Sequence, residues 1–511
     1  MFLRLGFALC LLGVSLQTAA ALTSHPCLPC HTREVQRFKN SAMGQSLSKP
    51  NDEPDGAFTH APSSSEISVF RKDGRMHQRI QEHGLTADYP VAYSVGYGNV
   101  GRSFLIDLGG NLFQSPAAFY TRRAEWGASP GYETQKILDF DRSITSDCLN
   151  CHTGLIQKTA SQTMLAPITC ERCHGDTETH RKHPSATSIV NPVRLPQRQR
   201  DSVCEQCHLE GATSILNPGK HWSDFVPGEA LEAIETHYVY RTRDNGALPI
   251  AAVSQAEQLA LSACLRGSGG KLWCGTCHDP HGEPVDRKQQ IRSICQSCHS
   301  PSQLAQSHSP EQADCVSCHM PSRQAVDVSH AAITDHRIGR RPETATAPAK
   351  TRFLSAWQPA EPPFAARNLA LALFHSAKER VSGQDLQKAY SLLSQISASE
   401  TDAEVCAAKG YILLANGRTG AALSNFESAT RQVPGNTEYW LDLGVAQDAA
   451  GDPDSASRSL RKSIAAGPYD YRPYKALAGL YKRLGQQQQA KTAIDDFLQL
   501  VPQSILMRLD Q

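Results

Sequence analysis

Three patterns of apolar and polar positions divide the chain of 511 residues. The first 21 residues start with a positive charge at Arg4 and continue as an apolar run over 5–16, followed by three alanines. Short segments within about 60–145 alternate between apolar and polar side chains. Residues 403–502 repeat one apolar pattern every 34 residues. These patterns predict a targeting segment, a β-rich part and a helical part.

The alternating segments predict two hairpins. Strands with a period of two that are joined by Asp-Gly or Gly-Gly are typical of tight β-turns. The first hairpin is expected around Asp73-Gly74 and the second around Gly109-Gly110, from the segments Glu66–Phe70 with Arg75–Ile80 and Ser103–Leu108 with Asn111–Gln114. We therefore predict a small β-rich insert at about 60–145, packed beside the cysteine-containing motif at residues 27–31.

The 34-residue pattern predicts pairs of helices. Segments 403–434, 437–468 and 471–502 each carry glycine, alanine and a closing proline at the same offsets. Small residues suit the contact between two helices, and the proline ends the second helix. This is the tetratricopeptide pattern, with a degenerate repeat expected at about 366–400. We predict an α-solenoid over 364–511 that binds a peptide or a protein, with an ordinary helical bundle as the alternative.

Composition marks a targeting segment at the start of the chain and a linker between its two halves. Residues 1–21 have the charged start, apolar core and small-residue end of a secretory signal peptide, which predicts a periplasmic or secreted protein. No later stretch approaches 18 apolar residues, so we expect no membrane span after cleavage. Five prolines within 341–363 predict a linker between the repeats and a domain over 22–340. The formal net charge is +1 and no basic stripe indicates nucleic acid.

The motif Cys-x-x-Cys-His occurs seven times and uses 14 of the 17 cysteines. It is the attachment signature of c-type haem, because two thiols add to the vinyl groups of one porphyrin and the histidine binds the iron. We number these motifs as boxes 1 to 7 and predict seven covalently attached haem c groups. Their cysteines and proximal histidines are Cys27, Cys30 and His31; Cys148, Cys151 and His152; Cys170, Cys173 and His174; Cys204, Cys207 and His208; Cys274, Cys277 and His278; Cys295, Cys298 and His299; and Cys315, Cys318 and His319.

Zinc sites and disulfides are the alternatives for the paired cysteines. Neither explains why a histidine follows all seven pairs when only 20 of 511 residues are histidine. The sequence therefore favours a loop-rich multihaem cytochrome c domain.

Electron-carrying haems usually hold iron between two protein ligands, so the histidines outside the boxes are candidate distal ligands. The stronger candidates lie close to boxes, and they are His180, His281, His308, His330 and His336. His60 and His237 are weaker candidates, because their regions contain no box. Met43 is an alternative distal ligand for box 1, whose sixth ligand is the least certain.

Several boxes resemble a known family. Ile168–Gly175 with His180, Trp273–His281 and Asp314–Pro321 resemble the cytochrome c-552/c-554-like multihaem proteins. Thr334–Ile338 ahead of the repeats is similar to secreted seven-haem proteins that carry both modules, and the resemblance covers nearly the whole mature chain. It implies covalent, mostly bis-histidine haems and electron transfer outside the cytoplasm. The chain departs from the family at Asp176-Thr177, in the loop that leads to His180.

The leading hypothesis is an electron carrier that meets an unidentified redox partner protein, with the repeats docking a protein. The alternative is an enzyme, a multihaem reductase of a small nitrogen or sulfur oxyanion with one five-coordinate haem. A third reading, an assembly scaffold with structural haems, fits seven boxes poorly. The predicted architecture is mainly α: a haem domain with a β-rich insert, then an α-solenoid.

Overall fold

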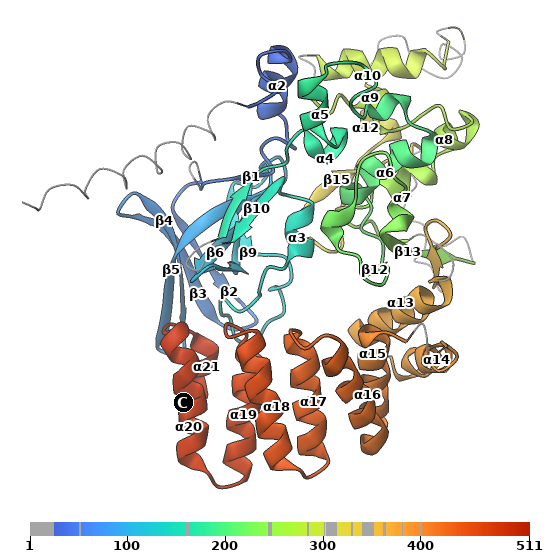
Figure 1. Ribbon diagram of the computed structural model, residues 1–511. Coiled ribbons are helices and arrows are strands. Elements are labelled where there is room, and N and C mark those ends of the chain that lie inside the picture. Colours follow the sequence, from blue (N-terminus) through green and yellow to red (C-terminus); the bar gives the residue numbers. More distant parts are fainter. Residues whose placement is uncertain are drawn as a thin grey trace, which may run out of the picture.

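The computed structural model arranges three parts around one another: the box-bearing segments, a β-sheet and a row of helix pairs (Figure 1). It describes residues 25–50, 53–158, 163–243, 248–283, 286–300, 302, 314–328, 331–339, 352–360, 364–380, 382–397 and 401–511. The predicted signal peptide and the candidates His308 and His330 lie outside these residues. In the part of the chain that is described, no helix is both long and apolar enough to cross a membrane.

The β-sheet is antiparallel, with the order β2-β3-β4-β5-β6-β7 and β1 beside β5. The turn Asp73-Gly74 has φ values of +50° and +73°, as the type I′ turn of a two-residue hairpin requires. The strands are β1 Leu47–Ser48, β2 Gly56–His60, β3 Ser65–Lys72, β4 Arg75–Glu82, β5 Leu85–Val95, β6 Ser103–Leu108 and β7 Asn111–Gln114, followed by the separate pair β8 Ala117–Tyr120 and β9 Glu125–Ala128. Both predicted hairpins are present, as β3-β4 and β6-β7. The β-structure starts before residue 60, because β1 and β2 add to it.

The C-terminal part is a row of antiparallel helix pairs (Figure 1). The helices are α13 Ala365–Glu379, α14 Gly383–Leu393, α15 Ala403–Ala415, α16 Thr419–Gln432, α17 Thr437–Ala449, α18 Pro453–Ala466, α19 Tyr471–Arg483, α20 Gln487–Leu500 and α21 Ile505–Leu509. The pairs α15-α16, α17-α18 and α19-α20 coincide with the three segments that recur every 34 residues. Glycine is needed where the helices touch, since a Cβ on Gly410 would lie 2.7 Å from the ring of Phe426.

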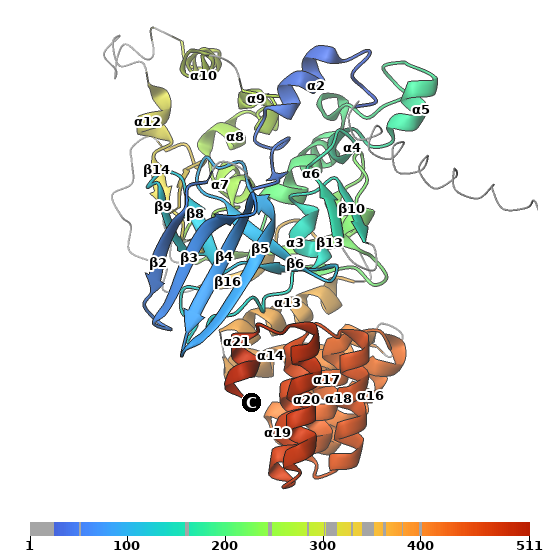
Figure 2. The same cartoon turned by 90° about the vertical axis from the view of Figure 1, so that its left-hand side faces the viewer.

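The sheet and the end of the helix row share one hydrophobic core. Ile67 and Phe104 of the sheet belong to the same buried cluster as Phe497 and Met507 of the last helices. Figure 1 shows the sheet directly above α20 and α21, and in Figure 2 α21 lies beside the lower ends of β4 and β5. The sequence predicts this β-rich insert beside box 1. In the structure one apolar face of the sheet covers the end of the repeats, and another sheet cluster, with Leu47 and Tyr93, packs against Leu149 of box 2. The first face and the end of the repeats are both apolar, and packing them against each other removes both from water.

The box-bearing segments contain short elements. These are α2 Thr32–Lys39, α3 Ser146–Asn150, β10 Leu155–Lys158, β11 Thr163–Ala166, α4 Glu171–His174, α5 Thr177–Lys182, η1 Pro192–Arg194, α6 Gln197–His208, β12 Thr213–Leu216, η2 Trp222–Asp224, η3 Leu231–Ala233, β13 Glu235–Thr242, α7 Gln255–Ala260, α8 Ala263–Gly267, α9 Cys274–Cys277, α10 Arg287–Gln296, α12 Cys315–His319, β14 Ser322–Gln324 and β15 Ala332–Thr334.

The predicted linker also needs a correction. Residues Arg352–Ala356 form β16, which pairs with β13 in a three-stranded sheet ordered β12-β13-β16. The described part of 341–363 is therefore attached to the box-bearing domain. The strand has only five residues, and a pattern this short within a proline-rich segment does not predict a strand.

Candidate functional site

The local fold of a box is one turn of helix. The backbone N–H of the histidine donates to the C=O of the first cysteine, at 2.9 Å for His31 and Cys27, 2.9 Å for His174 and Cys170, 3.0 Å for His278 and Cys274 and 2.9 Å for His299 and Cys295. Residues i, i+3 and i+4 share one face of a helix. The turn therefore presents both sulfurs and the imidazole of a box to one side.

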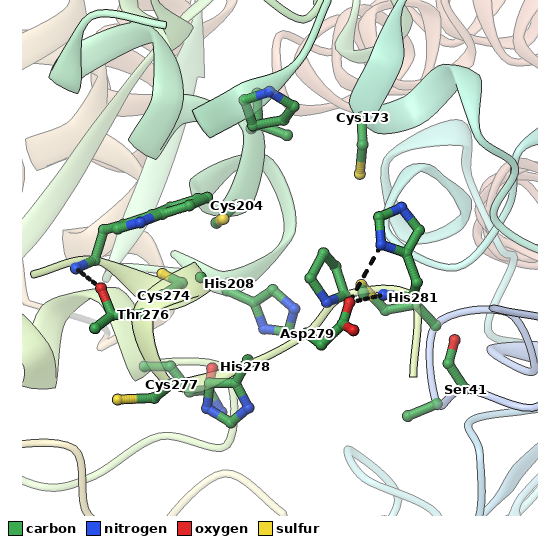
Figure 3. A pocket seen from close by; sticks show the side chains of 18 of the residues that line it. Ser41, Cys173, Cys204, His208, Cys274, Thr276, Cys277, His278, Asp279 and His281 are labelled. Carbon is green, nitrogen blue, oxygen red and sulfur yellow. Dashed lines mark hydrogen bonds and ion pairs between the residues drawn. The ribbon is translucent and has the colours of Figure 1, made fainter. Parts of the chain in front are cut away.

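All seven boxes open into one continuous cavity of about 4250 Å³, which all 14 box cysteines and all seven box histidines line. A pocket for one drug-sized molecule has about 300–1,000 Å³. The cavity therefore has room for several large groups at once. Figure 3 shows part of this cavity, with Cys204 and Cys274 close together and His281 beside Asp279.

Three box histidines each face a second imidazole across the cavity. The ring centroids of His31 and His180 are 6.2 Å apart, and the planes are tilted by 31°. The corresponding values are 6.0 Å and 16° for His174 and His281, and 6.3 Å and 30° for His278 and His336. Imidazole nitrogens bind first-row metals at about 2 Å, and a ring nitrogen lies about 1 Å from its centroid, so two imidazoles on one metal have centroids about 6 Å apart. The three spacings fit a metal held between the rings.

The Nδ1 atoms of His174, His180, His281 and His336 in these pairs, and that of His319 in box 7, contact other groups. Nδ1 lies 2.8 Å from the C=O of Val190 in His174, 2.6 Å from that of Gly339 in His319 and 2.9 Å from that of Thr334 in His336. A carbonyl oxygen only accepts, so Nδ1 carries the proton and Nε2 offers its lone pair. Nδ1 also contacts Ser188 in His180 and Asp279 in His281, at 3.0 and 3.2 Å. Such outer contacts orient metal-binding imidazoles.

The remaining candidates lie in different places. His237, on β13, lines the cavity, and burial lowers its pKa to about 4, so it is neutral as a metal ligand must be. His60 is only 4% exposed, belongs to the sheet and is not among the residues that line the cavity. Its Nδ1 lies 2.7 Å from the Oγ of Ser63. Met43 lines the cavity, but His180 faces His31 at box 1, so that box has a second imidazole after all.

A buried group of charges surrounds box 4. Arg198 pairs with both Glu205 and Glu232, and the indole N–H of Trp357 donates to Glu205 at 3.0 Å. Burial raises the pKa of Glu205, and Arg198 opposes that rise. No sequence pattern marks this group, because Trp357 lies in the segment that was predicted as a linker.

Three family descriptions match parts of the chain. Residues 122–175 match "Cytochrome c554 and c-prime", residues 267–304 match "Doubled CXXCH motif" and residues 413–480 match "Tetratricopeptide repeat". The chain is 26% identical over 155 residues to "Multiheme cytochrome MtrA" of Shewanella baltica (strain OS185), a match that covers 28% of this chain and 45% of the relative. The chain thus spans less than half of the curated relative it matches.

Solved structures of MamA match a share of this chain similar to the share that the cytochrome relative matches. The crystal structure of MamA is 19% identical, with a TM-score of 0.25, and covers 28% of this chain and 81% of its own. MamA 41-end from Desulfovibrio magneticus RS-1 is 17% identical, with a TM-score of 0.24, and the match covers 27% of this chain and 80% of that chain. Scores this low carry no weight for the fold. The family matches and the cytochrome relative support covalently bound haem c and a tetratricopeptide region.

Proposed function

We propose that this protein is a seven-haem c-type cytochrome that transfers electrons outside the cytoplasm. The observation that carries the proposal is the set of three facing imidazole pairs in a cavity that all seven boxes line. Each haem would supply an iron that changes by one electron, and the two facing imidazoles of a pair would hold that iron and leave no position open to other molecules.

The axial pairs we assign are His31 with His180, His174 with His281 and His278 with His336. His180 thus serves box 1 although it follows box 3 in the sequence. For boxes 2, 4, 6 and 7 the candidates are His237, His308 and His330, of which His237 lines the cavity. With His60 withdrawn, the candidates number one fewer than the boxes.

The helix pairs form an α-solenoid that docks the redox partner or another protein. Its C-terminal end is covered by the sheet, which leaves the sides of the helix row for a partner. Residues 1–21 act as the export signal, since haem c is attached outside the cytoplasm. The reductase alternative placed an open iron at box 1, and the position of His180 opposite His31 removes that reason.

The proposal is tested by the intact mass of the exported protein. We expect the mass of residues 22–511 plus seven haem groups. A mass with fewer groups, under conditions in which a control multihaem cytochrome is fully loaded, contradicts the assignment.

A further inference from the structure

One wall of the cavity is a three-stranded sheet whose other face carries the repeats. The strands β12, β13 and β16 form this sheet, and Figures 1 and 2 both place α13, the first helix of the C-terminal row, next to it. Successive side chains of a strand point to opposite faces. On β13, Glu235 and His237 line the cavity, whereas Tyr238 belongs to a buried cluster that it shares with Leu371 of α13. One strand therefore joins the cavity to the first repeat helix.

The neighbouring strand shows the same division between the two faces. Residues directly opposite each other in an antiparallel pair share a face. Ser214 of β12 lies opposite His237 and lines the cavity, whereas Ile215 lies opposite Thr236 and packs in the cluster with α13. A slip of one residue would turn every side chain of β13 to the other face. The register of β13 thus decides that His237 faces the cavity.

Asn368 of α13 holds that register from the side of the repeats. Its side chain is 0% exposed, and its amide donates to Oγ1 of Thr236 at 3.1 Å. Its own oxygen accepts from Arg367 at 2.7 Å, and Arg367 also donates to the C=O of Leu216 at 2.9 Å. Thr236 precedes His237 and Leu216 ends β12, so these hydrogen bonds hold both strands beside His237.

Contacts at two further points fix β13 around His237. The N–H of Trp357, which follows β16, donates to the C=O of His237 at 2.8 Å, and its indole N–H donates to Glu205 of box 4 at 3.0 Å. On the side of the repeats, the hydroxyl groups of Tyr240 and Ser376 lie 2.7 Å apart. The strand is therefore tied to α13 on one face and to box 4 at its edge.

The three facing imidazole pairs follow a rule that also assigns an iron to His237. His180 follows box 3 and faces box 1, His281 follows box 5 and faces box 3, and His336 follows box 7 and faces box 5. Each second imidazole thus comes from the segment after the box that stands two places further along the chain. Of the described histidines between boxes 4 and 5, His237 is the one that lines the cavity. The rule pairs it with box 2.

Box 2 lies beside the segment that carries His237. Its helix α3 contacts η2 of that segment, and Trp222 of η2 lines the same cavity as His237. The Sγ of Cys151 in box 2 also lies 3.7 Å from the C=O of Gln206 in box 4, where the segment begins. Two separate contacts thus bring this segment to box 2.

We infer that His237 is the second axial ligand of the iron at box 2 and that Asn368 is the positioning residue that keeps it there. The inference rests on the proposed function. The first helix of the repeats is then part of a haem site, because it holds the strand that carries an axial ligand. A movement of α13 therefore changes the ligation of one iron and leaves the other six as they are.

Carbon monoxide binding to the ferrous holoprotein tests the ligand. His237→Ala should gain binding at about one of the seven haems over the wild type, because an axial position opens. In a Cys148→Ser/Cys151→Ser background, which lacks the haem of box 2, His237→Ala should add no binding. A gain that persists in this background overturns the assignment to box 2. No gain in either background overturns His237 as a ligand.

Asn368→Ala and Thr236→Val test the positioning role. Each should gain part of the binding that His237→Ala gains, and combining either with His237→Ala should add nothing further. Thr236→Val removes only the hydroxyl and keeps the β-branched shape, so it decides the question if Asn368→Ala does not fold. Asn425→Ala, which removes an amide that donates within its own helix α16, is the matched control and should gain none.

Two outcomes separate this inference from the proposed function. A loss of unfolding free energy in Asn368→Ala and Thr236→Val without any gain in carbon monoxide binding overturns the positioning role. Wild-type protein with fewer than seven groups by intact mass overturns the proposed function instead. Seven groups with the wrong binding pattern overturn only the inference about His237 and Asn368.

Discussion

The imidazole rings of His174 and His281 face each other at 6.0 Å with only 16° between their planes, although His174 belongs to box 3 and His281 follows box 5. The Nδ1 of His281 contacts Asp279, which also pairs with Arg37 near box 1 at 2.8 Å. One carboxylate thus connects the orientation of a distal imidazole to the first box.

Asp279→Asn tests this connection. A carboxylate that accepts from an imidazole raises its basicity and stabilises the oxidised iron. We expect the reduction potential of the box 3 haem to rise and the others to stay unchanged, measured by redox titration followed by electron paramagnetic resonance. Asp286→Asn, at the exposed start of α10, is the matched control and should change no potential. A uniform shift of all haems would argue against a local role.

His60→Ala separates the structural histidine from the ligands. His60 contacts Ser63, Ser63 contacts Ser65 at 2.6 Å, and Ser65 donates to Glu82, all within the buried side of the sheet. Opening this chain of hydrogen bonds should cost about 1–3 kcal/mol of unfolding free energy. Denaturant unfolding should show this loss while the haem spectrum stays that of the wild type. A new high-spin haem in this variant would restore His60 as a ligand.

Asp139→Ala tests the contact between the sheet and the repeats. The carboxylate accepts from Ser504 Oγ at 2.6 Å and from the N–H of Leu506 at 3.0 Å. Its removal leaves buried donors without a partner, at a cost of about 1–3 kcal/mol. We expect faster proteolysis of the C-terminal helix and a lower unfolding temperature. Asp495→Asn, on the exposed side of α20, is the control, and equal effects of the two variants would contradict a specific contact.

The repeats should lose stability as pH rises. Burial raises the pKa of Asp442 to about 7, with Glu438 adding to the rise and Lys378 and Arg472 opposing it. The folded state therefore holds this proton more tightly than the unfolded chain, whose pKa is about 4. The stabilisation is complete below about pH 4 and is lost by about pH 7.

Asp442→Asn should reduce the difference in unfolding free energy between pH 5 and pH 8 by on the order of 1–3 kcal/mol. Asp141, whose pKa burial also raises to about 7, keeps part of the dependence. Denaturant titrations at the two pH values measure the difference. An unchanged difference in the variant would mean that Asp442 does not carry it.

Local features of the fold were predictable because their signals lie within a few residues. The spacing of a box places its cysteines and histidine on one helical turn, Asp73-Gly74 fits a two-residue turn, and Gly410 fits a close helix contact. In each case backbone geometry alone restricts the residue type.

The partners across the cavity were not predictable in the same way. His180 stands six residues after His174, yet it faces His31, because tertiary packing and not sequence distance brings box 1 over α5. His60, a weaker candidate, lies on a strand beside serines and is not among the residues that line the cavity, and the sequence carries no signal for that placement. The cover of the repeats by the sheet depends on two apolar faces that are far apart in sequence.

The central claim is that His180, His281 and His336 are distal ligands, and carbon monoxide binding tests it most directly. Carbon monoxide binds ferrous haem only at an open position, so each of the variants His180→Ala, His281→Ala and His336→Ala should gain binding to about one of the seven haems over the wild type. His183→Ala, an exposed histidine beside His180, is the control and should gain none. Difference spectra in which the three variants match the wild type would contradict the account.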